Sequence, residues 1–181
     1  MVDLLQIIQN IVDAISPAGG GGLTGLMFIL AWVIGVTLVI IGIRQAATRG
    51  ENGRQAGSWA QPMWTVIIGV CFVALPGLSD TLAQTFFSQD TPDPSSIFSY
   101  APATVGLMEA GSPARNMIVG IVTIIRFLGF IAIMRGLLLL RETANGSGQR
   151  THFGAGITFV CSGAFAINFP LFMAVMESLF V

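Results

Sequence analysis

The chain has 181 residues, of which 54% are hydrophobic and only 9% charged, with a formal net charge of −1. Soluble domains carry about 25% charged residues, so this composition excludes a surface that is wholly exposed to water and indicates an all-α integral membrane protein. All eight basic residues are arginine. The near-neutral balance excludes the basic surface typical of nucleic-acid binding, so no sequence-specific contact with DNA or RNA is expected.

The N-terminal region, residues 1–22, predicts an amphipathic helix over residues 3–16, followed by a hinge. Apolar residues recur with helical spacing on one face, and amide and carboxyl side chains occupy the other. Pro17 ends the helix and Gly19–Gly22 form the hinge. Because the polar face has no Lys or Arg, we expect this helix at the outer interface or against a neighbouring subunit.

Residues 23–87 predict a first helical hairpin. The run Leu23–Ile43 contains no charge, and its 21 residues match the ~20 that a membrane-spanning helix needs. A second apolar stretch begins at Met63. Pro76 is expected to kink this second helix, which continues amphipathically through Phe87.

Residues 88–114 are rich in proline and acidic side chains and predict a polar outer connector. Residues 115–181 predict a second hairpin. Its first span, Met117–Leu140, is interrupted by Arg126 and Arg135, and its second, Phe153–Val175, contains Pro170 as a predicted kink. The sequence therefore predicts four transmembrane helices.

Arginine positions predict the orientation of these helices. Six arginines lie in or beside the two short loops: Arg44, Arg49 and Arg54 in the first, and Arg135, Arg141 and Arg150 in the second. The positive-inside rule places both loops in the cytoplasm, which puts the connector and both termini on the periplasmic side of a bacterial inner membrane. These arginines are expected to reach lipid phosphates or to line the lumen of an assembly.

The two predicted hairpins align with a constant offset of 94 residues and no gaps. Aligned identities include the glycine pairs Gly35/Gly129, Gly42/Gly136 and Gly69/Gly163, and the prolines Pro76/Pro170. Both copies then share one orientation, as in a parallel repeat. The glycines predict a seam where helices approach closely; the alternative is that glycine is simply common in membrane helices.

Arg126 lies near the middle of its span, where a charge costs at least ~2.5–3.5 kcal/mol unless it is paired or hydrated. If the second hairpin turns near Gly146, Arg126 lies level with Asn168, which could accept its hydrogen bond. The same register sets Arg115 opposite Glu177. The alternatives are that Arg126 contacts lipid or a lumen, or serves a transport site.

The motifs that carry enzymatic chemistry are missing from the sequence. His152 is the single histidine, and it has neither a cysteine nor a carboxylate cluster that would make a metal site, nor the partners of a catalytic triad. We therefore expect neither an enzyme nor a cofactor, apart from bound phospholipid.

The second predicted hairpin resembles a known family. Its first span reads Phe127-Leu128-Gly129-Phe130-Ile131-Ala132-Ile133-Met134-Arg135-Gly136, and its closing helix holds Gly156-Ile157-Thr158, Ser162-Gly163 and Ala166-Ile167-Asn168. These segments resemble the IcmC/DotE family of type IVB secretion systems and its TraQ relatives in conjugative plasmids. The family pattern has a His after the Thr and a Gly-Gly pair, where this chain has Phe159 and Ser162-Gly163. The resemblance implies a structural component of a conjugation or secretion apparatus.

Each half of the chain also resembles a conjugative pilin, a two-span hairpin with a basic cytoplasmic loop. This second resemblance implies a tandem pilin-like subunit that polymerises with its own copies into a conjugative pilus, with phospholipid between subunits and other secretion components as partners. The alternatives are a fixed inner-membrane part of the secretion channel, and a small transporter or channel that uses Arg126.

Overall fold

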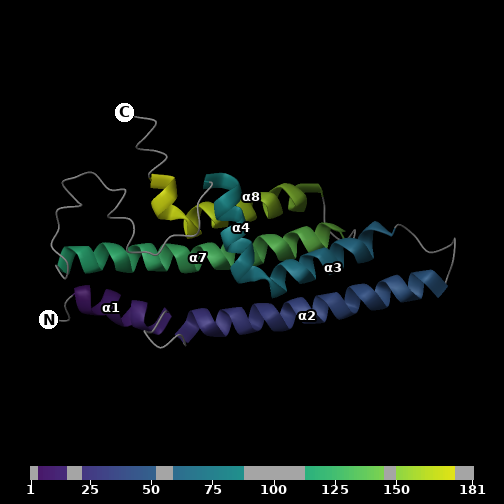
Figure 1. The fold of residues 1–181 in the computed structure, drawn as a ribbon, viewed down its shortest axis with the longest axis horizontal. Coiled ribbons are helices and arrows are strands. Elements are labelled where there is room, and N and C mark those ends of the chain that lie inside the picture. The colour runs from purple at the N-terminus through teal and green to yellow at the C-terminus, as the bar shows by residue number, and fades with distance from the viewer. Residues whose placement is uncertain (1–3, 16–21, 52–58, 88–112, 145–149, 174–181) are drawn as a thin grey trace. The chain divides into compact units, whose positions relative to one another are not determined.

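The computed structural model describes residues 4–15, 22–51, 59–87, 113–144 and 150–173. Within these ranges every regular element is a helix, as predicted (Figure 1). The predicted connector is residues 88–114, of which 113 and 114 instead begin a helix and 88–112 lie outside the described residues, as do the loop residue Arg54 and the C-terminal Glu177.

Three helices match the predicted elements closely. α1 (Leu4–Ile15) is the predicted amphipathic helix. α2 (Gly22–Glu51) and α7 (Pro113–Ala144) are continuous and are long and apolar enough to cross a membrane. Both extend past their apolar runs into the arginine-containing segments, because Arg, Gln and Ala are good helix formers.

The second predicted span is two helices rather than one kinked helix. α3 (Ala60–Val73) and α4 (Leu75–Phe87) are bent by 93° at a break centred on Ala74. Pro76 lies in the first turn of α4, where its missing N–H and fixed φ are tolerated. The predicted kink is therefore a sharp break, and the described chain has two candidate spans, or three if this bent pair is counted as one.

The fourth predicted span is also shorter than expected. α8 (Arg150–Ile167) ends before Asn168, and helical turns resume over residues 169–173. Its apolar part, Phe153–Ile167, is too short to count as a span by itself. The described chain therefore does not confirm four spans.

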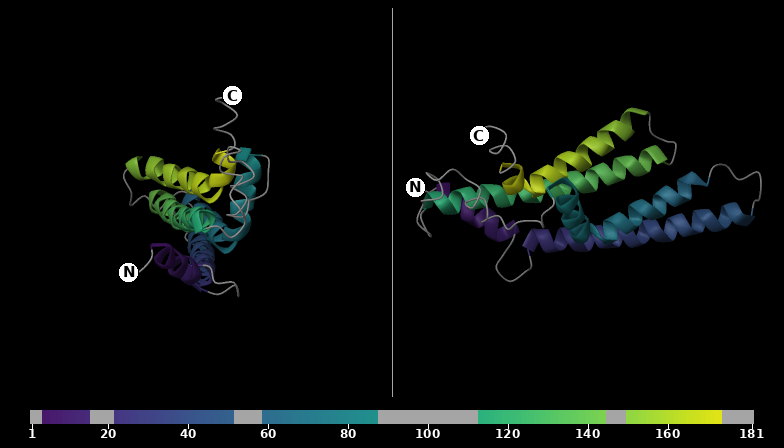
Figure 2. Two further views of the ribbon diagram at one scale, coloured as in Figure 1. Left: turned by 90° about the vertical axis from the view of Figure 1, so that its left-hand side faces the viewer. Right: turned by 45° about the horizontal axis from the view of Figure 1, so that its top comes forward.

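The chain divides into two compact units. The first unit combines α1, the start of α2 as far as Leu26, α4 from Ser79, α7 as far as Ile131, and α8 from Gly163 onward. The second unit combines α2 from Met27, α3, the start of α4 as far as Leu78, α7 from Ala132, and α8 as far as Ser162. Figure 2 shows α3 running back beside α2, and α8 beside α7. The first unit buries Ile15, Ala83, Val122, Phe130, Ala164, Ile167 and Leu171; the second buries Ala31, Leu38, Ile68, Phe72, Leu75, Ile133 and Leu137.

Helix α1 is held in the first unit by two contacts. The Thr24 hydroxyl donates a hydrogen bond of 2.7 Å to the Ile15 carbonyl, which satisfies one of the free acceptors at the end of α1. At Gly120 of α7, an added Cβ would lie 2.6 Å from Ile8 and 3.3 Å from Val12. The apolar face of α1 therefore packs into a notch that a glycine leaves open.

Candidate functional site

The seam between α2 and α3 is closely packed around glycine. A Cβ added to Gly35 would lie 2.7 Å from both the Gly69 carbonyl oxygen and the Val73 nitrogen, and one added to Gly69 would lie 3.0 Å from the Gly35 oxygen. These are backbone atoms, so no side chain separates the two helices. Such an approach permits Cα–H···O contacts and close van der Waals packing, which drive helix association where lipid surrounds the helices.

The seam between α7 and α8 has the same construction. A Cβ on Gly129 would meet the Gly163 oxygen at 2.9 Å and the Ile167 nitrogen at 3.0 Å. One on Gly136 would meet the Gly156 oxygen at 2.8 Å. Neither glycine can accept a larger side chain unless the helices separate.

The contacts of the two seams correspond at the offset of 94 residues. Gly35 and Gly129 are equivalent, as are Gly42 and Gly136, and each meets equivalent partners on the opposite helix. These partner pairs are Gly69/Gly163, Val73/Ile167, Val66/Val160 and Pro62/Gly156. All six glycines predicted for helix packing thus take part in a seam, and Gly156 and Gly120 are contacts that the sequence reasoning missed.

The two helix breaks correspond at the same offset. Ala74 donates its N–H to Val70 at 2.9 Å and its carbonyl accepts from Leu78 at 2.8 Å. Asn168 makes the equivalent bonds with Ala164 at 3.1 Å and Phe172 at 3.0 Å. Each break is followed two residues later by a proline, Pro76 or Pro170. The backbone hydrogen bonds at Ala74 and Asn168 are therefore the same in pattern.

Asn168 does not have the predicted partner. It is 1% exposed, its amide Nδ2 donates to the Ala164 carbonyl at 3.0 Å, and its Oδ1 has no hydrogen-bond partner. The predicted hydrogen bond from Arg126 to Asn168 is therefore absent. Arg126 is half-buried on α7 and interacts with other groups. Arg115 lies in the first turn of α7, but the proposed pairing with Glu177 falls outside the described residues.

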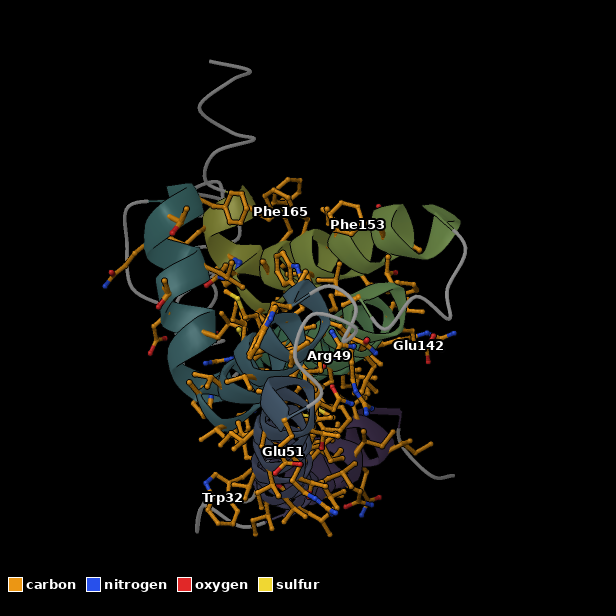
Figure 3. All side chains as sticks on the ribbon, turned by 90° about the vertical axis from the view of Figure 1, so that its right-hand side faces the viewer. Trp32, Arg49, Glu51, Glu142, Phe153 and Phe165 are labelled. Atoms are coloured by element: carbon orange, nitrogen blue, oxygen red, sulfur yellow. The ribbon has the colours of Figure 1, made fainter. Side chains whose placement is uncertain are left out.

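Arginines gather at the end of α2. Arg44 is exposed, Arg49 is half-buried, and the Nη2 of Arg49 donates to the Oε1 of Gln61 on α3. Figure 3 shows Arg49 near the end of α2, two residues before Glu51. A hollow of about 400 Å³ is lined by Ile41, Arg44, Gln45, Thr48 and Arg49. Guanidinium and hydroxyl groups beside an apolar side chain can hold an anionic group at a membrane surface.

The arginines of the second hairpin have different surroundings. Arg135 is exposed, with its guanidinium carbon 5.4 Å from the centre of the Phe159 ring. This distance permits a cation–π interaction. Arg141 is half-buried and its Nε has no hydrogen-bond partner. Arg150 begins α8, but its side chain is not among those described.

Two further hollows lie beside the helices. One, of about 380 Å³, is lined only by apolar side chains of α2 and α3 and by Trp59: Ile43, Ala46, Trp59, Pro62, Met63, Val66 and Ile67. Another, of about 280 Å³, lies between α1 and α7 and includes the polar Gln9, Asp13 and Asn116. Within the described ranges, no three His, Cys, Asp or Glu residues gather closely enough to hold a metal ion.

Comparison with known proteins provides no relative. No protein family, curated protein or solved structure shows significant similarity to this chain.

Proposed function

We propose that this protein is a structural membrane subunit of a bacterial conjugation or type IVB secretion apparatus, built from two tandem hairpins of the same orientation. The observation that carries the proposal is the correspondence of the two seams and two breaks at one offset. The similarity of the second hairpin to the IcmC/DotE family supplies the biological setting.

In this proposal the chain crosses the membrane four times. α2 and α7 supply two full spans, and α3 and α8 return beside them. The 14 residues of α3 cover only about 21 Å, so this return is shorter than a ~30 Å hydrocarbon core. The arginines at the joined ends of each hairpin favour cytoplasmic loops.

Lipid and further copies of the chain are the proposed partners. Large apolar side chains are exposed along all four membrane helices, including Ile29 and Trp32 on α2, Trp64 on α3, Leu128 on α7 and Phe153 on α8. A subunit with such a surface must be covered by acyl chains or by neighbouring subunits. The arginine-lined hollow of α2 is suited to a phospholipid head group. We therefore favour a pilin-like subunit that polymerises side by side with its copies.

The test is electron microscopy of filaments sheared from donor cells, with mass spectrometry of their main protein. The proposal expects this chain to be the main component. Arg44→Ala and Arg126→Ala should reduce filament number while the protein remains in the membrane fraction. Gly154→Ala is the matched control, because a Cβ at Gly154 meets nothing within 4 Å.

The other outcomes separate the alternatives. A chain confined to the inner membrane, with no filament that contains it, would contradict polymerisation and favour a fixed part of the secretion channel. Solute flux through the purified protein that is lost in Arg126→Ala would instead favour a small transporter or channel.

A further inference from the structure

The side chains exposed on α3 and on α4 differ in chemistry. Those exposed on α3 are large and apolar, and they include Trp64, Ile67 and Val70. Beyond the break, α4 exposes Asp80, Thr81, Gln84 and Thr85 along one face, while Phe86 is exposed near the end of the helix. The opposite face of α4 buries Ser79 and Ala83. Lipid can therefore cover α3, whereas the exposed face of α4 requires water or another polar partner.

The register of the seam shows which level of α2 lies beside the break, where the exposed side chains change from apolar on α3 to polar on α4. Gly35 faces Gly69, and the two helices are antiparallel, so the break at Ala74 is level with Leu30 of α2. Helix α2 continues for eight residues beyond that level to Gly22, which is about 12 Å.

That last part of α2 is suited to hydrocarbon. Its exposed large side chains are all apolar, namely Leu23, Leu26, Ile29 and Leu30. The charge-free run from Leu23 to Ile43 matches the thickness of a membrane only if these residues are included. Because α4 leaves α3 at 93°, it adds no length to the span. The membrane that covers α2 therefore extends past the point where α4 begins.

The end of α4 packs on aromatic side chains beside the second break. The ring of Phe86 lies 5.5 Å from the ring of Phe165, centre to centre, and the ring of Phe165 lies 5.7 Å from that of Phe172. These rings fix the end of α4 against the segment that contains Asn168, whose Oδ1 is buried without a partner. Polar groups at membrane depth are tolerated where they line a water-filled cavity.

We propose that the exposed polar side chains of α4 border a water-filled recess that enters the membrane from the side on which α2 begins at Gly22. Bulk water fills the recess and hydrates Asp80, Thr81, Gln84 and Thr85. The recess would also admit small hydrophilic solutes. This property is independent of the role in conjugation, since a subunit of any membrane assembly could have it.

The test is cysteine labelling of the full chain in native membranes with a charged maleimide that cannot cross lipid. Cys71→Ala and Cys161→Ala first remove the native thiols. Single cysteines are then placed at Thr81, Thr85, Val70 and Leu26. Labelling after denaturation in SDS gives the total amount of reactive cysteine in each variant. We expect the α4 positions to react from one side at least about tenfold faster than Val70 and Leu26, because hydrocarbon excludes a charged reagent.

Two results would overturn the proposal. Protection of the α4 positions from both sides would show that lipid or a protein partner covers this face. Labelling of Leu26 as fast as Thr85 would show that the membrane ends at the break and that no recess enters it. Neither result bears on whether the chain is found in filaments.

Discussion

The two glycine seams share their backbone contacts and differ in the side chains around them. At the position where α7 has Arg126, α2 has Trp32, which is 54% exposed and projects from the ribbon (Figure 3). Where the second break has the buried Asn168, the first has the exposed Ala74. Because the pairing of the helices depends on glycines and backbone atoms, the other positions can differ in chemistry between the two seams without loss of that pairing.

The largest effects are expected at the seams, where the hairpins are most alike. Gly35→Ala and Gly129→Ala should each destabilise the protein by about 1–3 kcal/mol, because the new Cβ would lie within 3 Å of backbone atoms that cannot move independently. Unfolding in detergent micelles measures both. Similar losses of stability in the two variants would support the equivalence of the seams. A loss in only one variant would contradict it. Gly50→Ala should stay within about 0.5 kcal/mol, since nothing lies near that site.

The breaks should respond to proline replacement. Pro76→Ala restores an N–H that can donate to the Phe72 carbonyl, so α3 and α4 should become more nearly collinear, with a stability change of at most about 1 kcal/mol. Spin labels at Ile67 and Gln84 report this change as a longer distance. An unchanged distance would mean that packing rather than Pro76 causes the bend. Pro170→Ala, measured from Phe159 to Met173, is the matched experiment in the second hairpin.

A side-chain link specific to the first hairpin should have a smaller effect. Gln61→Ala removes the acceptor of the Arg49 guanidinium and should lower stability by about 1 kcal/mol. The aligned positions of the second hairpin, Thr143 and Ala155, have no charge to pair. Unfolding of the single and double variants with Arg49→Gln measures the coupling, and strictly additive losses would show that the bond contributes nothing.

The smallest effect is expected for the link specific to the second hairpin. Phe159→Leu removes the ring beneath Arg135 and should cost about 0.5 kcal/mol, in line with exposed cation–π pairs. The aligned positions Ile41 and Thr65 cannot form such a pair. A double-variant cycle with Arg135→Gln isolates the interaction. If Phe159→Leu lowers stability by the same amount with Arg135 as with Arg135→Gln, the packing of the ring alone is responsible for the loss.

The seams could be predicted from the sequence because glycine spacing and the offset of 94 residues both constrain them. Gly156 also belongs to this pattern, since it faces Gly136 in the same register that pairs Gly129 with Gly163. Its position could therefore have been found by pairing residues across the turn.

The sharpness of the break between α3 and α4 could not be predicted. A proline within an apolar run is compatible with either a kink or a new helix, and the choice depends on the tertiary contacts of the following segment. The partners of Arg49 and Arg135 were missed for a related reason. Gln61 and Phe159 are ordinary residues in sequence, and only the rotamers and the distance between helices bring them to their arginines.

The notch at Gly120 has a consequence for synthesis of the chain. Ile8 and Val12 are made more than a hundred residues before Gly120, so α1 leaves the ribosome long before its seat on α7 exists. During that interval its apolar face needs another cover, such as the membrane interface or a chaperone. A ribosome-stalled chain that ends before α7 should therefore expose α1 to protease, whereas release of the full chain should protect it.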